Sequence, residues 1–112
     1  MELRQIPELD PQSAADRLAA GEAIALDVRE PDEWAAGRIG GAVHIPVGEL
    51  VVRQDEIPED VPIVAVCRTG SRSAWATEML VRAGYDVANL SGGLQAWEAV
   101  GLPLEPPGGY VA

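Results

Sequence analysis

Short apolar runs alternate with amphipathic segments along most of the 112-residue chain. Runs at residues 23–28, 62–66 and 85–90 have the length and content of buried strands. A shorter strand is predicted over 42–45, and an edge strand over 3–6. Because buried strands separated by helical segments are typical of parallel sheets with helices on both faces, the pattern predicts an α/β fold.

The helical segments carry recognisable start and stop signals. Asp10 followed by Pro11 predicts a helix N-terminus, since Asp caps the first turn and Pro suits the first helical position. From Ser71 to residue 83, apolar side chains recur at helical spacing. Shorter helical segments are predicted from Pro31 to just before Gly37, over 49–53, and after the turn Ser91-Gly92-Gly93.

Composition and charge narrow the class of protein. Eight basic and 18 acidic residues give a net charge of −10, so neither nucleic acid nor an anionic membrane is an expected partner. No apolar run approaches the roughly 20 residues of a membrane-spanning helix, and the first residues lack the apolar core of a signal peptide. The length predicts one domain over 1–112, with a core over about 3–104 and a C-terminal tail at 105–112.

Cys67 is the only cysteine in the sequence. With a single cysteine, an intrachain disulfide and a multi-cysteine metal site are excluded, and no metal is expected. A single cysteine fits a reducing compartment, for which the cytoplasm is the simplest expectation.

Four other residues are expected to have structural roles. His44, the only histidine, lies in a predicted apolar strand. Trp34 and Trp97 stand at helical positions among apolar residues and are expected to pack. Trp75 follows the cysteine segment, where it would line a rim or, as the favoured interpretation, pack in the core.

The segment with the clearest chemistry joins the 62–66 strand to the next helix. It reads Cys67-Arg68-Thr69-Gly70-Ser71-Arg72-Ser73. In open α/β sheets ligands bind at this end of the strands, where backbone N–H groups and a helix N-terminus form an anion cradle. Gly70 permits the curl, and two arginines add positive charge that favours the nucleophilic thiolate. A buried packing cysteine is the plainer interpretation, but these neighbours favour a nucleophile that relays a group between substrates.

Three stretches of the sequence resemble the signatures of the rhodanese-like sulfurtransferases. The cysteine segment is one. The others run from Leu26-Asp27-Val28-Arg29 through Gly37-Arg38-Ile39 to Pro46, and from Leu90-Ser91-Gly92-Gly93 to Gly101-Leu102-Pro103. Together they cover most of the chain from residue 23 to 103.

This resemblance implies both a fold and a function. The implied fold is a five-stranded parallel sheet flanked by helices. Cys67 is expected to accept a sulfane sulfur, become a persulfide and pass the sulfur on without a cofactor. Arg68 or Arg72 is expected to orient an anionic donor such as thiosulfate; the acceptor is cyanide, a thiol or a protein relay partner. The substrate-binding loop implied is Arg68, Thr69, Gly70, Ser71, Arg72 and Ser73, with Asp27 and Arg29 as candidate supporting residues.

Two other functions remain open. Cysteine-dependent phosphatases and arsenate reductases also place a cysteine in an anion-binding loop. Their loops typically hold one more residue than the four that separate Cys67 from Arg72, and a shorter loop suits a sulfur atom better than a bulky oxyanion. The second alternative is a non-catalytic docking or relay module, although the presence of Cys67 argues against an inert scaffold.

Overall fold

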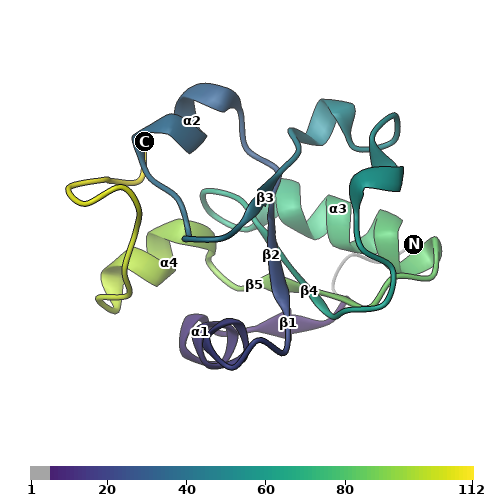
Figure 1. The fold of residues 1–112 in the computed structure, drawn as a ribbon, viewed down its shortest axis with the longest axis horizontal. Coiled ribbons are helices and arrows are strands. Elements are labelled where there is room, and N and C mark those ends of the chain that lie inside the picture. Colours follow the sequence, from purple (N-terminus) through teal and green to yellow (C-terminus); the bar gives the residue numbers. More distant parts are fainter. Residues whose placement is uncertain (1–5) are drawn as a thin grey trace.

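The computed structural model describes residues 6–112 and confirms the α/β fold (Figure 1). Within this range the strands are β1 (Glu8–Leu9), β2 (Ile24–Asp27), β3 (Val43–His44), β4 (Ile63–Val66) and β5 (Val87–Leu90). The helices are α1 (Pro11–Ala19), α2 (Pro31–Ala36), α3 (Ser71–Arg82) and α4 (Gly93–Ala99), and two short 3₁₀ turns span Val47–Glu49 and Gln54–Glu56.

The strands form one parallel sheet in the order β1-β5-β4-β2-β3. The central strand β4 is buried along its whole length, as its unbroken apolar sequence predicts. Because all strands run in the same direction, the carboxyl ends of β2, β4 and β5 lie at the same edge of the sheet. Cys67 follows β4 at this edge.

Helices cover both faces of the sheet, with α1 and α4 together on one side and α3 on the other (Figure 1). The alternation of side chains along β4 separates the two hydrophobic cores. Val64 and Val66 belong to the core beneath α1 and α4, whereas Ile63, Ala65 and Cys67 belong to the core beneath α3.

The predicted helix signals are confirmed where the structure describes them. Asp10 accepts a hydrogen bond from the backbone N–H of Ser13 at 2.8 Å, and Pro11 opens α1. The turn predicted over 49–53 is present as a bond from Arg53 N to the Glu49 carbonyl at 2.9 Å, between the two 3₁₀ turns.

Two further predictions concern the ends of the chain. The edge strand predicted over 3–6 falls largely outside the described residues; Ile6 lies in a bend, and the observed edge strand is β1, which pairs with β5. At the other end, the 105–112 segment folds back on the domain. Glu105 pairs with Arg38 through two backbone hydrogen bonds, and Tyr110 N donates to the Ala36 carbonyl at 3.0 Å.

Candidate active site

The thiol of Cys67 lies at the centre of the loop between β4 and α3 and is fully enclosed. Its Sγ accepts hydrogen bonds from the backbone N–H of Gly70 at 3.1 Å and of Ser73 at 3.4 Å. Ser73 Oγ lies 3.2 Å from the same sulfur. Gly70 has φ of 105°, a left-handed conformation that L side chains rarely adopt and that lets the chain curl around the sulfur into α3. The arrangement stabilises negative charge on sulfur, which a cysteine that only packs does not require.

The remaining loop side chains point elsewhere. Arg68, Thr69 and Ser71 are exposed at the surface. The loop backbone is anchored from behind by α4, because Leu94 N donates to the Cys67 carbonyl at 2.9 Å and Gln95 N donates to the Arg68 carbonyl at 3.0 Å. The loop therefore presents backbone donors inward to the sulfur and polar side chains outward to solvent.

Arg72 is held by Glu33, a partner that the sequence did not predict. Its guanidinium binds both carboxylate oxygens at 2.8 and 2.9 Å. This bidentate pair lowers the pKa of Glu33 from 4.5 to about 2, chiefly through the hydrogen bonds from Arg72, and it raises the pKa of Arg72. Glu33 therefore neutralises one of the two loop arginines, and Arg68 is the loop arginine whose side chain is exposed.

Asp27 and Arg29, the candidate supporting residues, form a buried ion pair at the end of β2. Arg29 Nε and Nη2 donate to Asp27 at 2.6 to 3.1 Å, and both side chains are 1% exposed or less. Arg29 also donates to the carbonyls of Glu33 at 3.2 Å and Gly37 at 2.8 Å. Arg29 thus binds α2 at Glu33 and at the residue that follows its last turn, and Glu33 in turn contacts the cysteine loop through Arg72.

One further polar residue near the sulfur, Asn89, was not predicted from the sequence. Asn89 on β5 is 3% exposed. It contacts Ser73 at 2.6 Å, the Gly70 carbonyl at 3.1 Å and the Glu8 carboxylate at 3.3 Å. The one available signal was an amide inside the otherwise apolar run Val87–Leu90.

The aromatic residues are mostly structural. Trp97 is buried and donates through Nε1 to the Pro103 carbonyl at 2.9 Å. Trp34 stacks on His44 with ring centroids 4.6 Å apart, and His44 Nε2 lies 2.7 Å from the Arg29 carbonyl, to which it donates. Trp75 contradicts the favoured interpretation: its side chain is 46% exposed and lines a depression with Val47 and Arg72.

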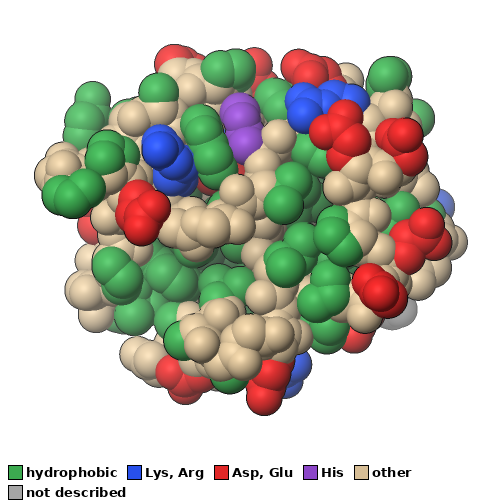
Figure 2. Space-filling view, in the orientation of Figure 1, with side chains coloured by type: hydrophobic (Ala, Val, Ile, Leu, Met, Phe, Trp, Pro, Cys, Tyr) green, Lys and Arg blue, Asp and Glu red, His purple; other side chains and the backbone are tan. Residues whose placement is uncertain are grey.

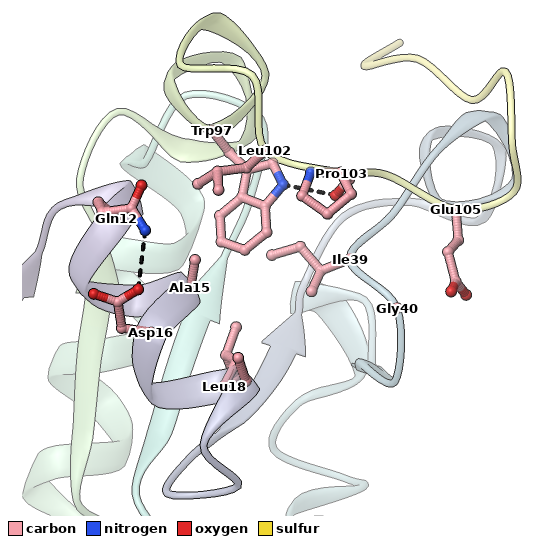
Figure 3. A pocket seen from close by; sticks show the side chains of 11 residues that line it. Gln12, Ala15, Asp16, Leu18, Ile39, Gly40, Trp97, Leu102, Pro103 and Glu105 are labelled. Atoms are coloured by element: carbon pink, nitrogen blue, oxygen red, sulfur yellow. Dashed lines mark hydrogen bonds between the residues drawn. The ribbon is translucent and has the colours of Figure 1, made fainter.

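A separate groove of about 460 Å³ lies between α1, α4 and the 102–105 segment. Figure 2 shows it as a hollow with hydrophobic side chains at its floor, and Figure 3 shows Ile39, Leu102 and Trp97 around it. These three residues pack with the core beneath α1 and α4, whereas Cys67 packs on the α3 side. The groove is therefore distinct from the cysteine site.

Residues 6–112 offer neither a ready metal site nor a membrane-spanning helix. No three histidine, cysteine, aspartate or glutamate side chains in this range are arranged to hold a metal ion. None of the helices in the same range is long and apolar enough to cross a membrane.

Comparison with known proteins agrees with the geometry of the cysteine loop. Residues 10–100 match the family model of the rhodanese-like domain. The chain belongs to this family. A sulfurtransferase from Allochromatium vinosum is 42% identical over 106 residues, which cover 93% of this rhodanese-like chain and 99% of the relative. A thiosulfate sulfurtransferase from Actinobacillus succinogenes is 32% identical over 99 residues, covering 88% of this chain and 89% of the relative.

Solved structures show the same rhodanese-like fold. A rhodanese-related protein from Thermoplasma volcanium superimposes with a TM-score of 0.84 at 30% identity, covering 88% of this chain and 96% of the other. The five-stranded parallel sheet and its flanking helices are therefore those of the family.

Proposed function

We propose that this rhodanese-like domain is a sulfurtransferase that carries a sulfane sulfur as a persulfide on Cys67. The observation that supports the proposal best is the environment of Sγ, which is enclosed and faces two backbone N–H groups and one hydroxyl at the start of α3. Such donors stabilise a sulfur anion without needing a general base. The names of the two relatives, a sulfurtransferase and a thiosulfate sulfurtransferase, agree with this chemistry.

In the first half-reaction the Cys67 thiolate attacks the outer sulfur of a donor such as thiosulfate. A bond forms between Sγ and that sulfur, the S–S bond of thiosulfate breaks, and sulfite leaves with the electron pair. The negative charge then resides on the outer sulfur of the persulfide. Arg68, the exposed arginine of the loop, is proposed to attract the anionic donor, while Arg72 remains paired with Glu33.

In the second half-reaction a thiophilic acceptor attacks the outer sulfur. With cyanide a C–S bond forms, and with a thiolate an S–S bond forms; in both cases the bond to Sγ breaks and the Cys67 thiolate is restored. The two steps balance without an external oxidant or reductant. The acceptor is a small molecule or the thiol of a protein relay partner.

The arrangement favours this function over phosphoryl transfer. An arginine that stabilises a transferring phosphoryl group must direct its guanidinium at the oxyanion. Both Nη groups of Arg72 instead donate to Glu33, and this pairing places a carboxylate beside the loop.

The first test is the intact mass of the folded, reduced protein after incubation with thiosulfate. The wild-type protein is expected to gain one sulfur atom, and cyanide is expected to remove it with formation of thiocyanate. Cys67→Ser should gain nothing while keeping its fold. A folded, reduced wild-type protein that gains no sulfur from thiosulfate or from an organic polysulfide would overturn the proposal, and turnover of a phosphate monoester in the same preparation would replace it.

A further inference from the structure

Asn89 is the polar residue of β5 and lies directly behind the candidate nucleophile. Its amide oxygen is 2.6 Å from Ser73 Oγ, and its amide nitrogen donates to the Gly70 carbonyl at 3.1 Å. Gly70 and Ser73 are also the two residues whose groups contact Cys67 Sγ. One buried amide is therefore bonded to both suppliers of hydrogen bonds to the sulfur.

The Ser73 hydroxyl has one proton and two acceptors within reach. Asn89 Oδ1 lies at 2.6 Å and Cys67 Sγ at 3.2 Å. While Cys67 is a neutral thiol, the hydroxyl can donate to Asn89 at the shorter distance and still accept a hydrogen bond from the S–H group. When the thiol ionises, the hydroxyl can stabilise the thiolate only by leaving Asn89, and a buried amide oxygen without a partner costs free energy.

We propose that Asn89 is a positioning residue that competes with Cys67 for the Ser73 hydroxyl proton. It favours each state in which Sγ is uncharged, namely the neutral thiol and the persulfide, in which the charge has moved to the outer sulfur. The persulfide part of this inference rests on the proposed function. The competition itself depends only on the two distances and on the single proton of a hydroxyl group.

Removing the Asn89 amide also removes its hydrogen bond to the Gly70 carbonyl, but this second loss is not expected to offset the stabilisation of the thiolate. The Gly70 carbonyl also accepts the backbone N–H of Ala74 at 3.1 Å, so it keeps a partner without Asn89. The loop is held independently through α4 by the Leu94–Cys67 backbone bond. The loss of Asn89 Oδ1 as an acceptor for the Ser73 hydroxyl is therefore expected to affect the Cys67 thiolate more than the loss of the Nδ2 donor to Gly70.

Substitution at position 89 also removes a partner of one charged group near the loop, because Asn89 Nδ2 donates to the Glu8 carboxylate at 3.3 Å. Arg72 is paired with Glu33, and the pKa of Arg72 is raised chiefly by its hydrogen bonds to Glu33 and to a smaller extent by Cys67. Nearby charged side chains are Arg68 in the loop, Glu30 before α2, Glu8 on β1, and the Asp27–Arg29 pair at the end of β2. The helices packed around the site also carry Asp32 on α2, Glu78 and Arg82 on α3, and Glu98 on α4.

The test is the rate of Cys67 alkylation by iodoacetamide as a function of pH, since only the thiolate reacts. Asn89→Ala is expected to shift the midpoint of the profile to lower pH and to speed alkylation about tenfold below it, the effect of one charge-assisted hydrogen bond. A change in access to the buried sulfur would instead scale the rate at every pH. Asn89→Asp keeps an acceptor and adds negative charge, so its midpoint is expected to move to higher pH.

Two further variants separate competition from damage to the fold. In a Ser73→Ala background there is no hydroxyl to compete for, so Asn89→Ala is expected to change the rate less than about twofold. Ser91→Ala is the matched control on the same strand end, because Ser91 Oγ contacts Glu8 at 2.7 Å and not the loop; its profile should match wild type.

Two results would overturn the inference. One is a midpoint that moves the same way in Asn89→Ala and Asn89→Asp. The other is an Asn89→Ala shift that persists in full without the Ser73 hydroxyl. Alkylation of Cys67 does not require sulfur transfer. A protein that gains no sulfur in the mass test can therefore still confirm or overturn the competition between Asn89 and Cys67.

Discussion

The guanidinium of Arg72 binds both oxygens of the Glu33 carboxylate, although 39 positions separate the two residues in the sequence. Arg72 belongs to the first turn of α3 and Glu33 to α2. The Glu33 carboxylate also accepts the backbone N–H of Glu30 at 2.9 Å, so its position is fixed from both sides. This contact joins the cysteine loop to the element that the Asp27–Arg29 pair holds in place.

The Glu33–Arg72 pair is expected to stabilise the fold in a pH-dependent way. The pKa of Glu33 is about 2 in the folded protein against an ordinary 4.5, so the unfolded chain binds the proton first as the pH falls. The stabilisation is therefore complete above about pH 5 and is lost between about pH 5 and pH 2. Because Arg72 is one-third exposed, Glu33→Gln is expected to reduce the free energy of unfolding at pH 7 by only about 1–2 kcal/mol.

Urea denaturation at several pH values measures this effect. The difference between wild type and Glu33→Gln should shrink as the pH is lowered from 7 toward 3. Glu59→Gln, at an exposed position, is the control and should stay within about 0.5 kcal/mol of wild type throughout. A Glu33→Gln difference that stays constant over this pH range would contradict the assignment.

Arg68 and Arg72 are expected to differ in their effects on substrate. Arg68 is exposed at the loop, so Arg68→Gln should raise KM for thiosulfate about fivefold while changing KM for a neutral organic trisulfide little. Arg72→Gln releases Glu33 and is expected to impair both substrates and to lower stability. Steady-state kinetics with both sulfur donors decides the matter, and equal losses for the two donors in Arg68→Gln would show that Arg68 does not select charge.

Gly93 is expected to tolerate no side chain. A Cβ at this position would lie 2.4 Å from the Arg68 carbonyl oxygen and 2.6 Å from Thr69 N, and its φ is +64°. Gly93→Ala should therefore displace the loop, lower stability by about 2–4 kcal/mol and reduce sulfur loading of Cys67.

The matched control is Gly101→Ala. Gly101 has a similar φ of +83°, but a Cβ there meets nothing within 4 Å, so only the conformational cost of about 1 kcal/mol is expected. Urea denaturation together with intact mass after thiosulfate measures both effects. Equal destabilisation with unimpaired loading in Gly93→Ala would show that its approach to the loop is unimportant.

The buried Asp27–Arg29 pair is expected to be essential to the fold. Asp27→Asn leaves a guanidinium enclosed without its carboxylate and should cost about 3–5 kcal/mol. The exposed pair of Arg53 with Glu49 is the contrast, since Glu49→Gln should cost no more than about 1 kcal/mol. Thermal or urea denaturation compares the two. Similar small losses would mean that a neutral amide at position 27 still satisfies the Arg29 side chain.

The central strand and two of the helices were predictable because the sequence features that produce them lie within a few neighbouring residues. The apolar content of β4, the Asp10–Pro11 start of α1 and the helical spacing after Ser71 each concern neighbouring residues. The edge strand predicted over 3–6 falls largely outside the described residues, and β1 depends on the pairing of Glu8 and Leu9 with Asn89 and Leu90 across the sheet, which a local pattern does not encode. Trp75 was assigned to the core because a helical position does not reveal which face of α3 remains uncovered.

By itself, the sequence determined the α/β class, the position of Cys67 directly after the 62–66 strand, and the loop that follows it. These follow from periodicity, glycine conformation and helix-start chemistry, which act over a few residues. Tertiary structure alone decided that Glu33 binds Arg72 and that Asn89 contacts Ser73 and Gly70. Parallel strands bring residues from distant parts of the chain to one edge of the sheet, so these contacts depend on strand order and side-chain direction, which local patterns do not encode.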